Sequence, residues 1–423
     1  MSSKVEYNAI ISESINGRAS CQSGKTTYVT KRVLIDACKQ DYLPVVSIFN
    51  YANIATDFLA KINSQKNNHG NKLFNIIDSR EKDTRYKKQN VGMSRLGEII
   101  ASTGNLDKDR KVDYRQTVLT GLSNHHYLRR LAYLLTNFDG AVPLYADEGD
   151  PLEMGYDIRF RTPSSRTGIV GESATNNSFR NFIEKNMFSQ VNLISATNAL
   201  IAISSIEFNN VKKITPGRTY NNNHTYFIVK LSDIKALEKG ILTPKMAEFV
   251  NLIENNILIN ICQTIECHEN IGSAFKNMED VKYHELNMNN TSFDVNDLNK
   301  GKHIVGGGRK FGRGATFPRV GGIIFDKASS HCTNIIQAVG RGHGYKASPT
   351  ILCCTQEQKD KLEAAYEFES QISTIDLLES SPERRWNKIR QIAIPDVGLK
   401  ILPTNANGWH QINKRGISRI ERI

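Results

Sequence analysis

No uninterrupted apolar run in this sequence approaches the roughly 20 residues that a membrane-spanning helix needs. The opening stretch, MSSKVEYNAIISESI, lacks a basic segment followed by a long apolar one, so no secretory signal is expected. There is also no repeat of fixed period and no low-complexity segment. At 423 residues the chain is therefore expected to form two or three globular domains that make no contact with a membrane.

Cysteine is scarce and scattered, with 7 residues in the whole chain. An odd count without a regular framework argues for a reducing compartment, so we expect a cytoplasmic location, or the host cytoplasm if the protein is viral. Cys262 and Cys267 lack the Cys-x2-Cys spacing of a zinc site, and buried apolar thiols are the favoured interpretation. No zinc finger, helix-turn-helix or nuclease constellation is recognisable.

Acidic residues are outnumbered, 43 against 55 basic ones, which gives a net charge of +12. Half of this excess lies in residues 383–423, which also hold both tryptophans of the chain. Basic side chains neutralise phosphates and aromatic faces stack on bases. The candidate nucleic-acid contacts of this tail are Arg384, Arg385, Trp386, Lys388 and Trp409. The alternatives are tryptophans that anchor the tail on the core, and a basic charge that serves solubility alone.

Apolar runs alternate with helical spacings along most of the chain, which predicts an α/β fold with parallel sheets. In residues 1–205 the strand candidates are PVVSIF, QTVLTGL, AVPLYAD and QVNLIS. In residues 206–355 they are NNILINICQTI, HIVGGG, VGGIIFD and PTILCC. Residues 356–423 begin with a helical pattern and end in the basic tail. We therefore predict two α/β domains, 1–205 and 206–355, and a helical and basic C-terminal extension, 356–423.

The stretch ASCQSGKTT has most features of a phosphate-binding loop, in which backbone N–H groups curl around an anion at the start of a helix. It matches G-x-x-x-x-G-K-[ST] except that Ala19 replaces the first glycine. Lys25 would meet the β- and γ-phosphates, and the Thr26 hydroxyl would bind Mg²⁺. The remaining candidate nucleotide-binding residues are Ser20, Cys21, Gln22, Ser23, Gly24 and Thr27. A weak preceding strand keeps a chance GKT open as the alternative.

A pair of carboxylates, Asp147 and Glu148, ends the apolar run AVPLYADEGD. In an α/β sheet the ligand lies at the carboxyl ends of the strands. One acid there could hold Mg²⁺ and the other could polarise water. A solvated acidic loop is the alternative interpretation.

These residues together resemble the motifs of superfamily two helicases. ASCQSGKT resembles their first motif and DEGD their DEAD or DEAH box. LISAT, RGATFPRVGGIIF and QAVGR resemble the third, fifth and sixth motifs, and all five occur in the family's order across residues 19–345. A closer likeness is to the Z-one type of ATPase domain of bacterial and phage proteins, because of QSGKT, VGGGRKFGRGAT and QAVGRGHGYK.

The resemblance implies two RecA-like domains with ATP and Mg²⁺ in the cleft between them. Lys25 and Thr26 would hold phosphates and Mg²⁺, Asp147 would sit near Mg²⁺, and Glu148 would activate the water. Arg341 would reach the γ-phosphate from the second domain, and Gln337 would help to sense the nucleotide. The residues that would couple hydrolysis to movement, or link the two sites, are Ser195, Thr197, Arg313, Gly314 and Thr316.

The sixth motif departs from the family pattern, because Gly344 stands where a second arginine is usual. His343 and Lys346 are alternatives for that role. No adenine-sensing glutamine motif precedes residue 19.

Nucleic acid, DNA ahead of RNA, is the expected partner, and it would cross both domains on the face away from ATP. Asn50, Ser123 and Asn124 follow strands where the family touches phosphates, although ordinary loop polarity is the alternative. The function implied is an ATP-dependent helicase or translocase. The alternative is a switch or motor subunit, without unwinding activity, of a restriction, defence or packaging complex, and partner proteins of replication, repair or defence are possible for either.

Overall fold

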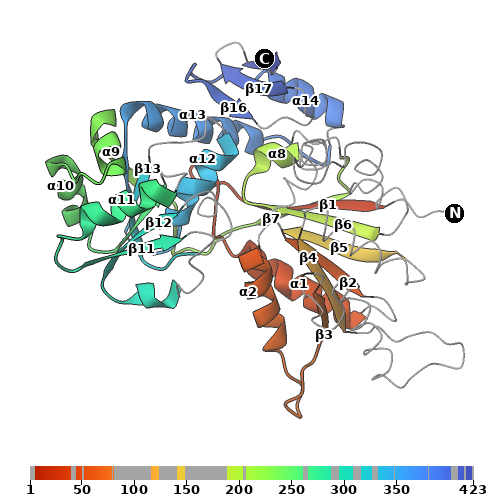
Figure 1. Cartoon of the computed structure of the whole chain (residues 1–423). Coiled ribbons are helices and arrows are strands. Elements are labelled where there is room, and N and C mark those ends of the chain that lie inside the picture. The colour runs from red at the N-terminus through yellow and green to blue at the C-terminus, as the bar shows by residue number, and fades with distance from the viewer. Residues whose placement is uncertain are drawn as a thin grey trace, which may run out of the picture.

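Two parallel β-sheets with helices on their faces form the body of the protein in a computed structural model (Figure 1). The structure describes residues 5–39, 44–49, 52–78, 80, 116–122, 141–147, 188–202, 206–260, 265–286, 295–307, 316–325, 332–346, 348–379, 381–401, 408–413 and 416–421. This architecture confirms the predicted α/β class. Within the described ranges, no helix combines the length and the apolar character needed to cross a bilayer.

The first sheet contains seven described strands in the order β3-β4-β2-β5-β6-β1-β7, all parallel. Their bounds are β1 (Glu6–Ser12), β2 (Val45–Phe49), β3 (Asn75–Asp78), β4 (Thr117–Leu122), β5 (Val142–Asp147), β6 (Phe188–Ser195) and β7 (Asn210–Ile214). One strand, β6, separates β1 from β5. The carboxyl ends of β1, β6 and β5 therefore meet at one edge of the sheet.

The second sheet has six described strands in the order β11-β12-β10-β13-β15-β9, also parallel. They are β9 (His224–Ile228), β10 (Asn256–Asn260), β11 (Val281–Leu286), β12 (Lys302–Gly307), β13 (Val320–Phe325) and β15 (Thr350–Cys354). A short antiparallel pair, β8 (Tyr220–Asn221) and β14 (Gly344–Tyr345), lies beside it. The first sheet includes β7, so it extends past the predicted boundary at residue 205.

Interior strands such as β2, β5 and β10 are buried on both faces, which explains why they are continuous apolar runs. In β1, Ile10 packs in one cluster with Val33 of α1 (Lys25–Lys39) and Phe58 of α2 (Ala52–Asn63). Ala9 and Ile11 face the opposite side and belong to a different cluster. Successive side chains of a strand point to opposite faces, so each face receives its own layer of helices.

Helices also cover both faces of the second sheet. They are α9 (Leu231–Glu238), α10 (Pro244–Leu252), α11 (Ile265–Phe275) and α12 (Cys332–Val339), with short 3₁₀ turns η1 (Val295–Asn299) and η3 (Gly340–Gly342). Phe249 and Ile271 lie in the outer cluster with α9 to α11. Leu352 and Ile336 lie in the inner cluster, which also contains Leu193 of the first sheet. The two domains therefore share one apolar core.

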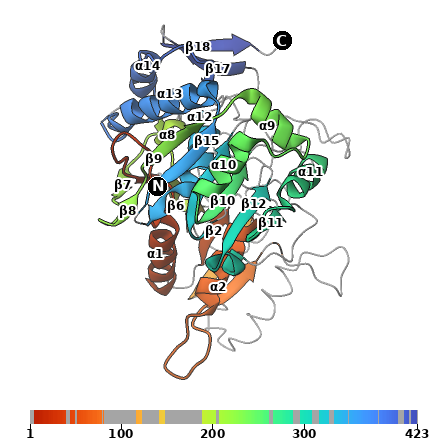
Figure 2. The same ribbon diagram turned by 90° about the vertical axis from the view of Figure 1, so that its left-hand side faces the viewer.

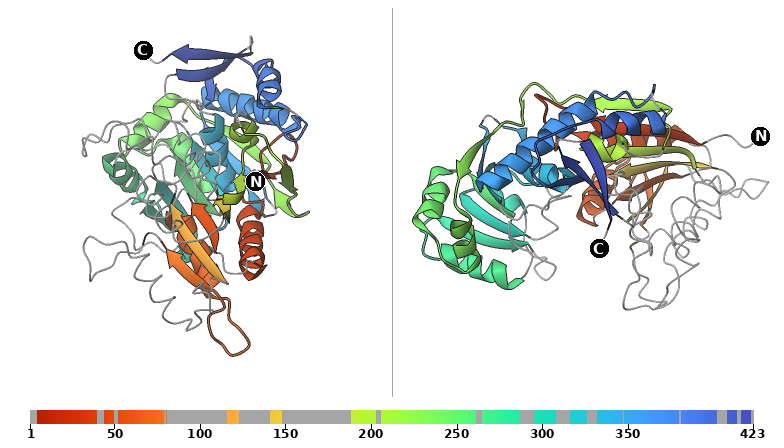
Figure 3. Two further views of the ribbon diagram at one scale, coloured as in Figure 1. Left: turned by 90° about the vertical axis from the view of Figure 1, so that its right-hand side faces the viewer. Right: turned by 90° about the horizontal axis from the view of Figure 1, so that it is seen from above.

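Helix α13 (Gln356–Ser373) crosses from the second domain to the first (Figures 1 and 3). Its N-cap is Thr355, whose side-chain hydroxyl accepts a hydrogen bond from the backbone N–H of Gln358. Along its length it packs against α12 and against α8 (Asn198–Ala202). Near its end the fully buried Glu369 accepts a hydrogen bond from the backbone N–H of Asn198. A single rigid element thus contacts both domains.

The C-terminal extension contacts α12 of the second domain and α8 of the first, and it is more regular than predicted. After α14 (Pro382–Arg390), strands β16 (Leu399–Ile401), β17 (Gly408–Asn413) and β18 (Gly416–Glu421) form a small antiparallel sheet (Figure 2). Arg385 of α14 is fully buried, and its guanidinium donates hydrogen bonds to the carbonyls of Ala202 and Ile206. The C-terminal extension therefore binds both ends of α8, through Glu369 at the first residue and through Arg385 at the last.

Burial makes Glu369 a source of pH-dependent stability, because it raises the pKa of this carboxyl to about 7, while hydrogen bonds from the amides of Asn198 and Ala199 act in the opposite direction. Between the ordinary value of 4.5 and about 7 the folded protein binds more protons than the unfolded chain, so its stability falls as the pH rises through this window.

Glu369 should lower the free energy of unfolding of the wild type by about 3 kcal/mol between pH 5 and pH 8. We expect Glu369→Gln, which cannot ionise, to lack this pH dependence. Thermal unfolding of both proteins at the two pH values measures it. Glu367→Gln, an exposed change on the same helix, should behave as the wild type. Equal pH dependence in Glu369→Gln and the wild type would contradict the assignment.

Candidate nucleotide-binding site

The predicted phosphate loop lies where an interior strand meets a helix. Strand β1 ends at Ser12 and α1 begins at Lys25, with the loop between them. Two loop residues have left-handed backbone conformations, Gln22 with φ of 56° and Gly24 with φ of 92°. Such turns aim successive N–H groups into one concavity. The sequence suggested a weak strand here because the loop between β1 and the helix is long.

Lys25 is buried at the amino-terminal end of α1, with only 7% of its surface exposed. Its ammonium donates hydrogen bonds to Ser12 Oγ at 2.8 Å, to the Ser20 carbonyl at 3.4 Å and to Ser23 Oγ at 3.5 Å. Ser12 Oγ and Ser23 Oγ are also 2.8 Å apart. The helix dipole is positive at this end, so dipole and ammonium favour an anion together. Ser12 carries no motif signal and was not predicted from the sequence.

Asp147 and Thr26 meet at the edge where the strands end. Thr26 Oγ1 donates to Asp147 Oδ2 at 3.3 Å, which joins the first turn of α1 to the end of β5. Asp147 is itself 6% exposed. A carboxylate and a hydroxyl are ligands suited to Mg²⁺, which usually keeps several waters and binds substrate phosphates. The two residues therefore fit the predicted metal role, whereas no cluster of three or more metal-binding side chains occurs in the described residues.

The sixth-motif residues lie on α12 and on the turn η3 that follows it. Gln337 and Arg341 are 1% and 7% exposed, and Arg341 Nη2 lies 3.5 Å from Gln337 Oε1. The Gln337 Nε2 group is buried and has no hydrogen-bond partner among the residues that the structure describes. A buried amide donor next to a guanidinium suits the binding of an anionic oxygen, which is the role predicted for this pair.

The phosphate loop contacts the η3 turn directly. Gln22 Nε2 donates to the Arg341 carbonyl at 3.0 Å and approaches the Gly340 carbonyl at 3.4 Å. Cys21 packs so closely on Gly340 that a β-carbon at position 340 would overlap its sulfur. Glycine is therefore required there by contact across the two domains.

The two alternatives for the second arginine, Lys346 and His343, are hydrogen-bonded to other parts of the chain. Lys346 Nζ donates to the Val320 carbonyl at 2.7 Å and also bonds Thr350, and burial lowers its pKa to about 8. Burial also lowers the pKa of His343 to about 3, and its Nε2 lies 3.4 Å from Tyr366 Oη. Arg341 stays the predicted finger.

Residues 220–224 of the second domain form hydrogen bonds with residues 15–21, which lead into the phosphate loop. Arg18 Nη1 donates to His224 Nδ1 at 2.8 Å, and burial followed by the charge of Arg18 lowers the pKa of His224 to about 3. Asn222 Nδ2 donates to the Ile15 carbonyl at 3.0 Å. Tyr220 Oη donates to the Cys21 carbonyl. These contacts were not predicted, because no motif marks residues 220–224.

The third-motif residues form a tight turn at the start of α8. Ser195 and Thr197 are fully buried, and Ser195 Oγ accepts from the Thr197 N–H at 3.1 Å and donates to its carbonyl at 2.9 Å. Asn198 follows, and its backbone N–H donates a hydrogen bond to the Glu369 carboxylate. The predicted coupling turn is thus bonded to α13, which also contacts α12.

Several predicted residues lie outside the described part of the chain, namely Asn50, Ser123, Asn124, Glu148, Arg313 and Gly314. Thr316 is exposed just before β13. The other members of the phosphate loop lie in the loop or in the first turn of α1; Ala19, Ser20, Cys21 and Ser23 are buried and Thr27 is exposed.

The residues of the C-terminal extension that were predicted to contact nucleic acid differ in their location. Arg384 and Lys388 are exposed one turn apart on α14, and Trp386 is partly buried against the core. Trp409 lies in β17. Arg385 is in the core rather than on the surface, because its guanidinium closes the carbonyl end of α8.

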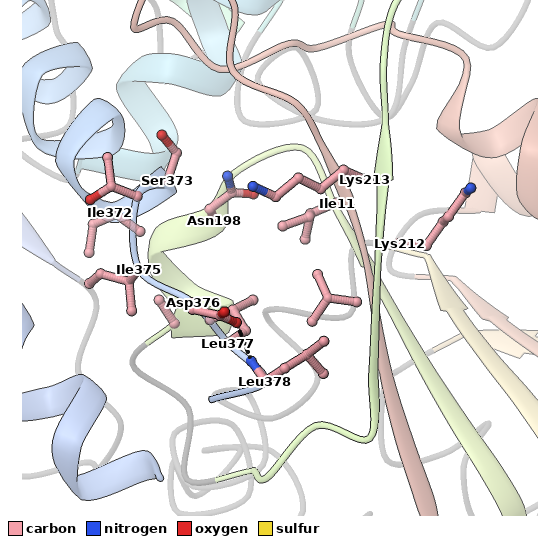
Figure 4. A pocket seen from close by; sticks show the side chains of 13 residues that line it. Ile11, Asn198, Lys212, Lys213, Ile372, Ser373, Ile375, Asp376, Leu377 and Leu378 are labelled. Atoms are coloured by element: carbon pink, nitrogen blue, oxygen red, sulfur yellow. Dashed lines mark hydrogen bonds between the residues drawn. The ribbon is translucent and has the colours of Figure 1, made fainter. Parts of the chain in front are cut away.

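A separate pocket of about 480 Å³ lies between α8, β7 and the segment that follows α13 (Figure 4). Asn198 and Lys213 point toward each other across it, and Ile375 and Leu377 line the other side (Figure 4). Among the described residues that line this pocket there is no predicted nucleotide-site residue. It is therefore distinct from the phosphate loop.

Solved structures of helicases share this fold. The DEAD-box helicase Mss116 bound to ssRNA and UDP-BeF is 15% identical, with a TM-score of 0.55 over 86% of this chain and 70% of that one. Mss116p (NTE and C-tail double deletion) bound to ssRNA and AMP-PNP is 17% identical, with a TM-score of 0.51 over 86% and 68%.

The ATP-dependent Type ISP restriction-modification enzyme LlaBIII bound to DNA is 10% identical, with a TM-score of 0.51 over 86% of this chain. This chain spans only 28% of that enzyme's length. No family model and no curated protein matches the sequence. At these identities the likeness concerns the fold, which is that of two tandem RecA-like domains as in superfamily two helicases. The Z-one resemblance stays a prediction.

The tight contact between Cys21 and Gly340 can be tested by a double-mutant cycle. We expect Gly340→Ala to destabilise the protein by about 1–3 kcal/mol, because the added methyl overlaps the Cys21 side chain. Cys21→Gly in the same chain should recover most of that loss, whereas the two effects would simply add if the residues were not in contact. Thermal unfolding of the four proteins gives the coupling. Additive effects would contradict the described packing.

Proposed function

We propose that this protein is an ATP-dependent nucleic-acid helicase or translocase, which hydrolyses ATP between its two RecA-like domains to move along or unwind DNA, or RNA. The observation that carries the proposal is the 3.3 Å contact between Thr26 Oγ1 and Asp147 Oδ2. It joins a phosphate-loop hydroxyl to a strand-end carboxylate from a distant part of the sequence. That pairing is what nucleoside triphosphate hydrolysis with Mg²⁺ requires.

In the proposed reaction the chain binds the triphosphate at the start of α1. Lys25 moves from its serine oxygens onto the β- and γ-phosphates, with backbone N–H groups of the loop around them. Thr26 and Asp147 would hold Mg²⁺, which supplies charge neutralisation of the phosphate oxygens. Glu148, one residue after Asp147, is proposed to orient and deprotonate the attacking water. Arg341 stabilises negative charge on the γ-phosphate from the second domain.

Work on nucleic acid requires that the two domains change their relation during the cycle. The coupling residues are proposed to be Ser195 and Thr197, through α8, together with Arg313, Gly314 and Thr316. Neighbouring structures were determined with ssRNA or DNA bound, which supports nucleic acid as the partner class. DNA is proposed ahead of RNA, and Asn50, Ser123 and Asn124 as contacts to its backbone.

A second candidate function is an ATP-dependent switch or motor subunit of a restriction, defence or packaging complex. Its support is the likeness to a restriction-modification enzyme of which this chain matches 28%. In that case the domains would act within a larger assembly. An isolated chain that hydrolyses ATP on nucleic acid, yet never separates strands until a partner protein is added, would favour this candidate. Robust unwinding by the isolated chain would favour the first.

The ATPase proposal predicts that nucleic acid stimulates hydrolysis and that Lys25→Ala lowers kcat/KM for ATP by at least about 100-fold, since the ammonium is lost from the phosphates. Steady-state phosphate release with and without single-stranded DNA measures both effects. Lys39→Ala, an exposed lysine in the last turn of the same helix, is the matched control and should hydrolyse ATP at the wild-type rate. Equal hydrolysis with and without any nucleic acid would argue against a helicase.

The tail proposal predicts that Arg384→Glu combined with Lys388→Glu weakens binding to single-stranded DNA about tenfold or more near 100 mM salt. Loss of two phosphate contacts should also lower the slope of log K against log salt by about 1.4. Fluorescence anisotropy across a salt series measures both. The control is Lys235→Glu with Lys239→Glu, the same charge change at the same spacing, with Lys235 on α9 and Lys239 directly after its last residue. If the two pairs weaken binding equally, α14 is not the contact surface.

A further inference from the structure

Gln22 connects the phosphate loop to the second domain through its side-chain amide. Its Nε2 group donates to the Arg341 carbonyl at 3.0 Å and lies 3.4 Å from the Gly340 carbonyl. Both acceptors belong to the η3 turn, more than three hundred residues along the chain. The phosphate loop therefore holds the main chain of the candidate arginine finger, not only the nucleotide.

The backbone at Gln22 is shaped for this contact. Its φ of 56° is in the left-handed region, which residues other than glycine and asparagine adopt infrequently. Such a conformation at a non-glycine residue persists only where surrounding contacts maintain it. On the other side, Gly340 leaves room for the loop, because Cys21 fills the space that a β-carbon at position 340 would occupy.

Fixing the main chain at Arg341 also fixes where its side chain begins. The guanidinium is buried and lies 3.5 Å from Gln337 Oε1. A shift of the η3 turn away from the loop would move that guanidinium away from the phosphate loop by a similar amount. Small misplacements of a group that acts on the transition state reduce rates strongly.

We propose that Gln22 is a positioning residue that holds the second domain, and with it Arg341, against the phosphate loop. Domain opening within the cycle then requires that the Gln22 amide leave the 340–341 carbonyls. This inference rests on the proposed ATPase function for its kinetic consequence, but its structural consequence is independent of hydrolysis.

Gln22→Glu is the sharpest test, because the side chain keeps its length while its amide donor becomes a carboxylate oxygen facing two carbonyls. Gln22→Asn is the second variant: asparagine tolerates the left-handed backbone but is too short to reach the turn. Gln65→Glu is the matched control. It also removes a hydrogen bond from a glutamine Nε2 to a backbone carbonyl, that of Lys61 at 3.2 Å, but within the exposed surface of the first domain.

The structural readout is the distance between spin labels at Lys31 on α1 and Glu269 on α11, both exposed, attached through an introduced unnatural amino acid. Without nucleotide, we expect the wild type and Gln65→Glu to give one narrow distance distribution. Gln22→Glu and Gln22→Asn should shift a substantial share of molecules to longer distances. Identical distributions in the wild type and both Gln22 variants would overturn the proposal.

The kinetic readout is kcat, which is measured at saturating ATP and therefore does not report a loss of nucleotide affinity. We expect kcat to fall at least about tenfold in Gln22→Glu and in Gln22→Asn, whereas Gln65→Glu should keep the wild-type value. Wild-type kcat in Gln22→Glu would overturn the proposal. If the wild type hydrolyses no ATP at all, the ATPase function fails, but the label distances still decide whether Gln22 holds the domains together.

Discussion

A buried ammonium group at the positive end of a helix is the arrangement on which the site depends. Lys25 stands at the first position of α1, where the helix dipole already favours negative charge, and serine oxygens hold it in place. The helix dipole and the ammonium charge both raise the affinity of the concavity for a multiply charged anion. Asp147 then enters at the rim, close enough to Thr26 to share a cation. The remaining residues of the site are arranged around this charge.

The two domains are joined more closely than a simple cleft would require. Apolar residues of both sheets form one cluster, and polar contacts from Arg18, Gln22 and Asn222 bind the loop region to the second domain. Helix α13 contacts α12, which carries Gln337, and also caps the turn that contains Ser195. Movement between the domains must therefore rearrange specific hydrogen bonds around the phosphate loop, and a change at the γ-phosphate is well placed to do so.

Local patterns predicted the fold class, most strands and the phosphate loop, because these depend on periodicity and on short spacings. The contact of Thr26 with Asp147 followed from the rule that parallel strands end at one edge. Strand β1 was hard to recognise because its helix begins only after a long loop. The burial of Arg385 was not predictable from a charged tail, since its partners, the carbonyls at 202 and 206, come from another domain. The hydrogen bonds of Tyr220 and Asn222 to the phosphate-loop region were not predictable either, because their partners are also distant in the sequence.

The position of α13 and α14 has a consequence for how the chain matures during synthesis. The face of the first sheet that includes Ile11 and Leu193 belongs to the same cluster as Phe368 and Ile389. The apolar surface around Ile11 and Leu193 is therefore covered only after Phe368 and Ile389 have been synthesised. A ribosome must release the chain through Ile389 before the first domain can complete its core, and chains that stop before this residue will expose that surface. Chaperone dependence should therefore rise when translation stops early.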